Sequence, residues 1–138
     1  MNEHLVTQAA EAGIDTILTC DNGISAIDQI HLAKELGMTV VVTDHHEVPY
    51  IEENGVRREK ISEADAIVNP KQEACQYPFK KLCGAAVAWK LVQVLYEQAG
   101  IPVSEADRFI ENAGFATVGD VMDLQGENRV LVKLGLKC

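Results

Sequence analysis

The chain alternates short β-branched apolar runs with longer segments whose apolar residues recur every three or four positions. The short runs predict strands at 15–20, 38–43 and 64–69. Short joints and one helical segment connect the first two runs, which is typical of parallel strands joined by a right-handed crossover. The pattern therefore predicts an α/β fold with a mainly parallel sheet.

The longer segments differ among themselves in polarity. They predict helices at 1–12, 24–36, 84–99, 104–113 and 128–137. The helix at 84–99 is apolar almost all round, which is typical of a helix buried on several sides. By contrast, 50–60 is polar and centred on Asn54-Gly55, the commonest two-residue hairpin turn, so an exposed hairpin or loop is predicted there.

Composition narrows the class of protein. The 138 residues, 47% of them hydrophobic, are enough for one domain with a sizeable core. No apolar run is long enough to span a bilayer and no leader pattern opens the chain, so a soluble, cytoplasmic protein is expected. Four cysteines without a C-x-x-C pair suggest neither a zinc site nor a disulfide framework. The net charge of −9 argues against a broad basic surface for nucleic acid, although bound divalent ions would reverse the local field.

The candidate chemistry gathers at strand ends. The run at 38–43 ends in Asp44, His45 and His46, and Asp21 follows the preceding strand. Parallel strands end on the same edge of a sheet, so these groups should emerge together. With Asp120 they form a carboxylate-rich set that suits Mn²⁺ or Mg²⁺, and two such ions can hold a phosphoryl group and activate a water.

Each of these residues also has a structural alternative. An aspartate after a strand, such as Asp21, is more often a helix cap than a ligand, and Asp44 could merely orient a histidine. Asp120, taken alone, would be an ordinary surface acid. The adjacent pair His45 and His46 is harder to explain by packing at a strand end, so a functional interpretation is favoured there.

Two further features are candidate substrate contacts. Arg57, Arg58 and Lys60, or the lysines at 80–81, could touch a DNA backbone, but solvated charges that offset nearby glutamates are the simpler alternative. The Gly-Ala-Ala start of the helix at Gly84 leaves backbone N–H groups uncovered, which makes it a candidate contact for substrate phosphate.

Several linked stretches resemble the DHH phosphoesterases. The segments 19–25, 41–47 and 116–124 are similar, in order and spacing, to the second, third and fourth motifs of that family. The segments 66–71, 82–90 and 127–129 resemble its RecJ-type exonuclease branch more specifically. The resemblance covers nearly the whole chain and implies a three-layer α/β sandwich, with a mainly parallel sheet flanked by helices.

The resemblance also implies a role for each candidate. Asp21 would bridge two Mn²⁺ or Mg²⁺ ions, with His45 and Asp120 as further ligands. Asp44, His45 and His46 would form the catalytic group, in which Asp44 fixes its neighbours and His46 faces the scissile phosphate. The implied reaction is metal-assisted phosphoester hydrolysis. In the RecJ-type branch it is 5′ to 3′ degradation of single-stranded DNA in recombination and repair, with that DNA as the expected partner.

The chain also departs from the family pattern. No Asp-x-Asp sequence, the family's first motif, occurs in it, and the family's C-terminal substrate-binding domain has no counterpart. Residues 1–138 are therefore interpreted as a partial DHH catalytic domain that is inactive by itself. Two alternatives stay open: a DHH phosphodiesterase acting on pyrophosphate, short oligonucleotides or cyclic dinucleotides, and a non-catalytic module that has kept the fold.

Overall fold

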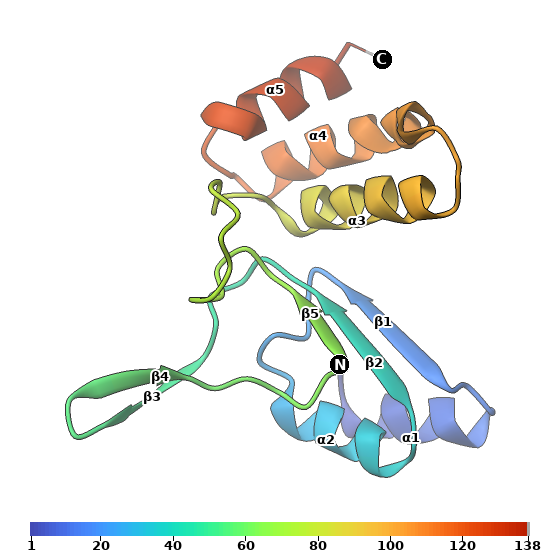
Figure 1. The fold of residues 1–138 in the computed structure, drawn as a ribbon, viewed down its shortest axis with the longest axis vertical. Coiled ribbons are helices and arrows are strands. Elements are labelled where there is room, and N and C mark those ends of the chain that lie inside the picture. Colours follow the sequence, from blue (N-terminus) through green and yellow to red (C-terminus); the bar gives the residue numbers. More distant parts are fainter. Residues whose placement is uncertain (138) are drawn as a thin grey trace. The chain divides into compact units, whose positions relative to one another are not determined.

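The computed structural model describes residues 1–137, and Cys138 lies outside the described residues. The chain divides into two compact units, Met1–Gln76 and Tyr77–Cys138 (Figure 1). Within the described part, none of the helices combines the length and the apolar character that crossing a membrane requires.

The first unit is built on a parallel sheet with strand order β1-β2-β5. Its strands are β1 (Thr16–Cys20), β2 (Thr39–Thr43) and β5 (Ala66–Val68). Helices α1 (Glu3–Glu11) and α2 (Ile27–Glu35) lie against one face of this sheet (Figure 1). The core between them consists of Val6, Ile30, Ala33, Met38, Val40 and Val42. The predicted mainly parallel sheet flanked by helices is thus confirmed.

The two helices of this unit begin in different ways. Asn2 caps α1, because its Oδ1 accepts a hydrogen bond from the backbone N–H of Leu5 at 2.9 Å. The predicted start of the next helix at Ile24 is wrong, since α2 begins at Ile27. The N–H of Ile24 instead donates to Asp44 Oδ2 at 2.9 Å, so this residue is held by a contact across the sheet edge rather than by a helical turn.

The polar segment after β2 forms the predicted hairpin. Strands β3 (Tyr50–Glu53) and β4 (Val56–Glu59) pair antiparallel. Asn54 and Gly55 join them with φ of 53° and 76°, the left-handed backbone that a tight hairpin turn requires. Because side chains alternate along a strand, neighbouring residues of the hairpin project from opposite faces.

The second unit is helical. It comprises α3 (Gly84–Gln98), the 3₁₀ helix η1 (Val103–Phe109), α4 (Ile110–Gly119) and α5 (Gly126–Gly135). Its core consists of Leu82, Cys83, Ala86, Val87, Ile110, Ala113 and Leu131. Helices α4 and α5 approach closely at two glycines, since a Cβ added to Gly114 would lie 3.2 Å from the Cα of Gly135.

Some predicted boundaries in this unit are wrong. The segment predicted as a helix from Ser104 is a 3₁₀ helix over 103–109 without a side-chain cap, and α4 then runs on to Gly119. A tertiary hydrogen bond explains the change, because the indole N–H of Trp89 donates to the Ala106 carbonyl at 2.9 Å. The final helix spans 126–135 rather than 128–137.

Candidate metal centre

The carboxyl ends of β1 and β2 bring two aspartates to one edge of the sheet. The parallel register pairs Cys20 with Thr43, the last residues of the two strands. Asp21 and Asp44 follow directly, so both leave the sheet at the same level. The side chains of Thr19 and Thr43 tie the two strand ends together, since Thr43 Oγ1 donates to the Thr19 carbonyl at 2.7 Å.

Asp21, His45 and His46 form a compact group of metal-ligating side chains. Each offers a ligand atom, and these atoms all lie within 4.8 Å of one another. Asp21 Oδ1 lies 2.9 Å from His45 Nε2, and the centroids of the two imidazole rings are 4.5 Å apart. The His45 side chain is only 11% exposed, whereas Asp21 is 47% and His46 is 58% exposed. The group is therefore anchored on the protein side and open to solvent on the other.

Asp44 is a buried carboxylate that organises the loop around it. It is 1% exposed and accepts hydrogen bonds from the N–H groups of Ile24 at 2.9 Å and His45 at 2.8 Å. Its Oδ1 also lies 2.6 Å from His46 Nδ1. Burial raises the pKa of Asp44, but the hydrogen bonds from Ile24, His46 and His45 outweigh it and hold that pKa below its usual value. Asp44 thus remains charged and directs the His46 ring.

The backbone at Asp21 and Gly23 adopts a conformation that is rare for most residues. Asp21 has a φ of 61°, in the left-handed region, and Gly23 has a φ of 111°. A Cβ on Gly23 would lie 2.9 Å from Thr19 Oγ1 and 3.1 Å from a methyl group of Val42. Both residues belong to the Asp-Asn-Gly stretch that follows β1. The close approach to β2 explains why the third residue has to be glycine.

Asn69 is a buried residue of this site to which the sequence interpretation gave no role. It is 2% exposed, its side-chain N–H donates to the His46 carbonyl at 3.0 Å, and its Oδ1 accepts from the N–H of Lys71 at 2.9 Å. The Asn-Pro pair after β5 was a usable signal, because asparagine at such positions commonly bonds to backbone two residues on. Asn69, which directly follows β5, therefore fixes the backbone of the segment that carries His45 and His46.

Two of the predicted site residues lie in the second unit. Asp120 is the C-cap residue of α4, and the next residue, Val121, has a φ of 53°. Gly84 is the buried first residue of α3, whose N-terminus has no side-chain cap. The structure brings together Asp21, Asp44 and the histidine pair within the first unit, while the roles of Asp120 and Gly84 toward that group stay predictions.

Comparison with known protein families decides the relationship. The family model described as "DHH family, N-terminal domain" matches residues 2–114. The chain belongs to the DHH family. The Asp44-His45-His46 sequence of this DHH domain thus stands at the end of a parallel strand, beside Asp21 from the neighbouring strand.

Two similar relatives of this DHH domain carry the same name. It is 40% identical over 136 residues to the single-stranded-DNA-specific exonuclease RecJ of Bacillus subtilis, covering 99% of this chain and 15% of the relative. It is 36% identical to RecJ of Haemophilus influenzae, covering 93% of this chain and 22% of the relative. The chain thus spans between a seventh and a quarter of these relatives' length.

Solved structures give the same picture. The crystal structure of exonuclease RecJ bound to manganese matches with a TM-score of 0.77 and 31% identity, over 99% of this chain and 32% of that one. RecJ from Thermus thermophilus in complex with Mn²⁺ matches with a TM-score of 0.76 and 31% identity, over 99% of this chain and 19% of that one. The resemblance stated from the motifs is therefore confirmed.

Proposed function

We propose that this DHH domain contributes part of the active site of a metal-dependent nuclease that hydrolyses phosphodiester bonds in single-stranded DNA. The observation that carries the proposal is the Asp21, His45 and His46 group, with its ligand atoms within 4.8 Å of one another and a buried carboxylate behind it. The names of the relatives support the substrate class. A role in DNA recombination and repair, in the cytoplasm, goes with this proposal.

The donor set fits a hard divalent ion. A carboxylate and imidazoles without a thiolate suit Mn²⁺ or Mg²⁺ better than a thiol-preferring metal, and Asp21 and His45 are the residues that would hold it. When bound, such an ion would lower the pKa of a water and offset the charge of the phosphate. Since Asp21 and His45 already lie 2.9 Å apart, little rearrangement of the side chains is needed to present both donors.

His46 is suited to contact the phosphate rather than to be buried. Its Nδ1 faces the Asp44 carboxylate, which favours the tautomer with the proton on Nδ1 and leaves Nε2 directed away from Asp44. With a side chain 58% exposed, it can approach a phosphate oxygen of a docked strand. Asp44 acts through His46 and the loop backbone, so we assign it a positioning role. Asp120 as a further ligand and Gly84 as a phosphate contact complete the proposal.

A Mn²⁺ titration by calorimetry tests the metal site in this chain. Asp21→Ala and His45→Ala should each weaken Mn²⁺ binding at least about tenfold, because each removes a ligand. His31→Ala is the matched control, since its imidazole is 57% exposed on α2 and is paired with Glu63 outside the site. Equal Mn²⁺ affinity in the His45→Ala variant and the unaltered chain would rule out this site.

Hydrolysis of end-labelled single-stranded DNA tests the activity. We expect the 138-residue chain alone to be inactive, because the group of donors in its first unit is too small to hold two ions. A longer protein that contains this domain should degrade the strand and lose that activity with His45→Ala. Mn²⁺-dependent turnover by the chain itself, abolished by His45→Ala, would overturn the prediction of inactivity. Turnover of pyrophosphate with no DNA hydrolysis would favour the small-substrate alternative.

A further inference from the structure

A cavity of about 280 Å³ opens in the first unit next to the histidine pair. It is lined by Glu47, Val48, Tyr50, Arg57, Glu59, Lys71 and Glu73. Glu47 directly follows His46 in the chain, so the wall of the cavity begins one residue, or about 3.8 Å of Cα spacing, beyond the candidate metal centre. A DNA strand with a phosphate at the metal centre would therefore have this cavity beside it.

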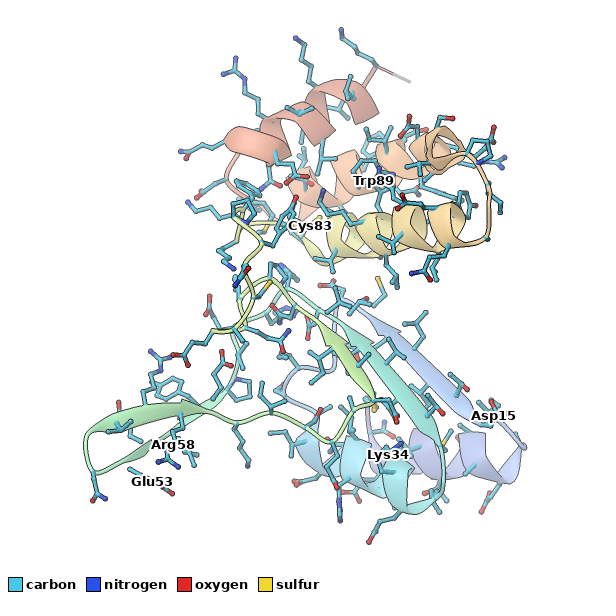
Figure 2. All side chains as sticks on the ribbon, viewed as in Figure 1. Asp15, Lys34, Glu53, Arg58, Cys83 and Trp89 are labelled. Atoms are coloured by element: carbon cyan, nitrogen blue, oxygen red, sulfur yellow. The ribbon has the colours of Figure 1, made fainter. Side chains whose placement is uncertain are left out.

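The hairpin supplies the cavity with a flat stacking surface. The guanidinium carbon of Arg57 lies 3.3 Å from the centroid of the Tyr50 ring. The two residues share a face of the hairpin, because Tyr50 pairs with Glu59 and Arg57 pairs with Glu52. Tyr50 is still 47% exposed, so this stack leaves planar surface open. Arg58 and Glu53, labelled in Figure 2, belong to the other face of the hairpin.

The charges around the cavity disfavour a phosphate as its occupant. Three carboxylates, those of Glu47, Glu59 and Glu73, face the two cations Arg57 and Lys71. Lys71 Nζ already lies 3.0 Å from Glu47 Oε1, which leaves little positive charge to attract an anion. Glu59 is held as well, because its Oε1 accepts the Glu73 N–H at 2.7 Å. A flat, neutral group with donors and acceptors on its edges fits this lining better.

We propose that this cavity binds a nucleobase of the DNA strand whose phosphate lies at the Asp21, His45 and His46 group. The inference rests on the proposed function. Bases of single strands stack on aromatic rings and on guanidinium planes, and the Tyr50 and Arg57 pair offers both. The paired side chains of Lys71 and Glu47 would offer a donor and an acceptor to the edge of the base. Because Glu47 follows His46, the cavity holds the nucleotide next to the one whose phosphate is bound.

Binding of two fluorescent strands of equal length tests this inference. One is oligothymidylate and the other is an abasic strand with the same phosphates, each titrated with the chain in Mn²⁺ and followed by fluorescence anisotropy. Tyr50→Ala should weaken binding of oligothymidylate by about five- to a hundredfold, the range measured for loss of base stacking. It should leave the affinity for the abasic strand unchanged.

The hairpin itself offers matched controls. Arg57→Ala and Arg58→Ala remove the same charge from opposite faces of the hairpin. Only Arg57→Ala should therefore change the affinity for oligothymidylate relative to the affinity for the abasic DNA. Ile51→Ala shortens an exposed apolar residue on the face opposite Tyr50 and should change neither affinity.

Three results would overturn the nucleobase site. They are equal losses on both strands, no loss on either strand, and no binding of oligothymidylate by the unaltered chain. Equal losses of affinity for both DNA strands would indicate a phosphate contact. No loss of affinity for either would favour a protein partner for the hairpin. Failure of the proposed function is recognised separately, because Mn²⁺ affinity would then be the same in His45→Ala and in the unaltered chain. The hairpin variants are not used in that Mn²⁺ titration.

Discussion

Each of the two units contains a carboxylate held by several partners, Asp44 in the first and Glu127 in the second, and the two are held in different ways. In the first unit Asp44 accepts hydrogen bonds mainly from backbone N–H groups of its own loop and of residue 24. In the second unit Glu127 is held by side chains, since Tyr77 Oη donates to it at 2.6 Å and Lys90 forms an ion pair with it. The first arrangement fixes an exposed histidine, whereas the second ties α3 to α5.

The pKa directions follow from that difference. Burial lowers the pKa of Lys90, but the contacts with Glu127 and Tyr77 outweigh it and raise that pKa above its usual value. Burial and the hydrogen bond to Glu127 both raise the pKa of Tyr77. This group of side chains therefore favours the protonated forms of its donors, while the loop around Asp44 favours a carboxylate. A network made of backbone donors serves the site, and one made of side chains serves helix packing.

Removing the Asp44 carboxylate should break the first arrangement with the largest effect. Asp44→Ala leaves the N–H groups of Ile24 and His45 buried without their acceptor, at a cost on the order of 3 kcal/mol for the two. Urea unfolding followed by circular dichroism measures the loss, and hydrogen exchange at the Ile24 amide localises it. Asp44→Asn keeps an acceptor oxygen and should lose less. An unchanged free energy of unfolding in Asp44→Ala would contradict the role of Asp44 in holding this loop.

The helix packing of the second unit should be sensitive to a single methyl group. A Cβ on Gly135 would lie 2.8 Å from the Ile110 carbonyl oxygen, so Gly135→Ala forces α4 and α5 apart at a cost of about 1 to 3 kcal/mol. Gly119→Ala is the control, because a Cβ there meets nothing within 4 Å. Trp89, the one tryptophan of the chain, reports unfolding of this unit by fluorescence. The prediction fails if both variants unfold at the same urea concentration.

A smaller effect on the free energy of unfolding is expected from removing the hydroxyl group of Tyr77. Tyr77→Phe removes the hydrogen bond to Glu127 but leaves the ion pair with Lys90, so the loss should be about 1 kcal/mol. Thermal unfolding monitored through Trp89 measures it. Tyr50→Phe, in the first unit, removes a hydroxyl from a tyrosine that is 47% exposed and serves as the matched control. A larger loss in Tyr50→Phe than in Tyr77→Phe would contradict the assignment.

The smallest effects should appear in the dependence of stability on pH, and they should differ between the units. The hydrogen bonds from Lys34 and from the Val40 N–H hold the pKa of Asp65 below 3.8, so its contribution is present above that pH and is lost on acidification. The pKa of Lys90 is raised above 10.5, so its contribution is present below that pH and is lost in alkali. Hydrogen exchange in β2 should respond to acid, and Trp89 fluorescence should respond to alkali.

Variants of these two residues sharpen the pH comparison. Asp65→Asn should remove part of the acid sensitivity of β2 without altering the alkaline response of Trp89. Lys90→Met should do the reverse, since it removes the titrating amine from the second unit only. Loss of both responses in either variant would show that the two units do not respond separately to pH.

The sequence pattern predicted what depends on neighbours along the chain. Asp44, His45 and His46 are adjacent, and the β-branched run before them places them at a strand end without further information. The parallel pairing then brings Asp21 to the same edge. Local pattern was also sufficient for the hairpin, where Asn54 and Gly55 specify the turn.

What the pattern missed depends on contacts between distant residues. The start of α2 moved because Ile24 bonds to Asp44, which is 20 positions away, and the 3₁₀ helix arose because Trp89 bonds to Ala106, which is 17 positions away. Sequence analysis considered Arg57 as a contact for a DNA backbone or, more simply, as a solvated charge that offsets nearby glutamates. Its stacking on Tyr50 requires the register of the hairpin, which periodicity alone does not specify.

The left-handed backbone of Asp21 has a consequence for how such a domain would change over many generations. Glycine adopts a φ of 61° without steric cost, so Asp21→Gly would relieve strain that the present residue carries. A copy of this domain that no longer depended on the carboxylate would gain stability from Asp21→Gly and would tend to accept that substitution. The carboxylate of Asp21 is therefore presented from a backbone conformation that glycine would adopt at lower cost.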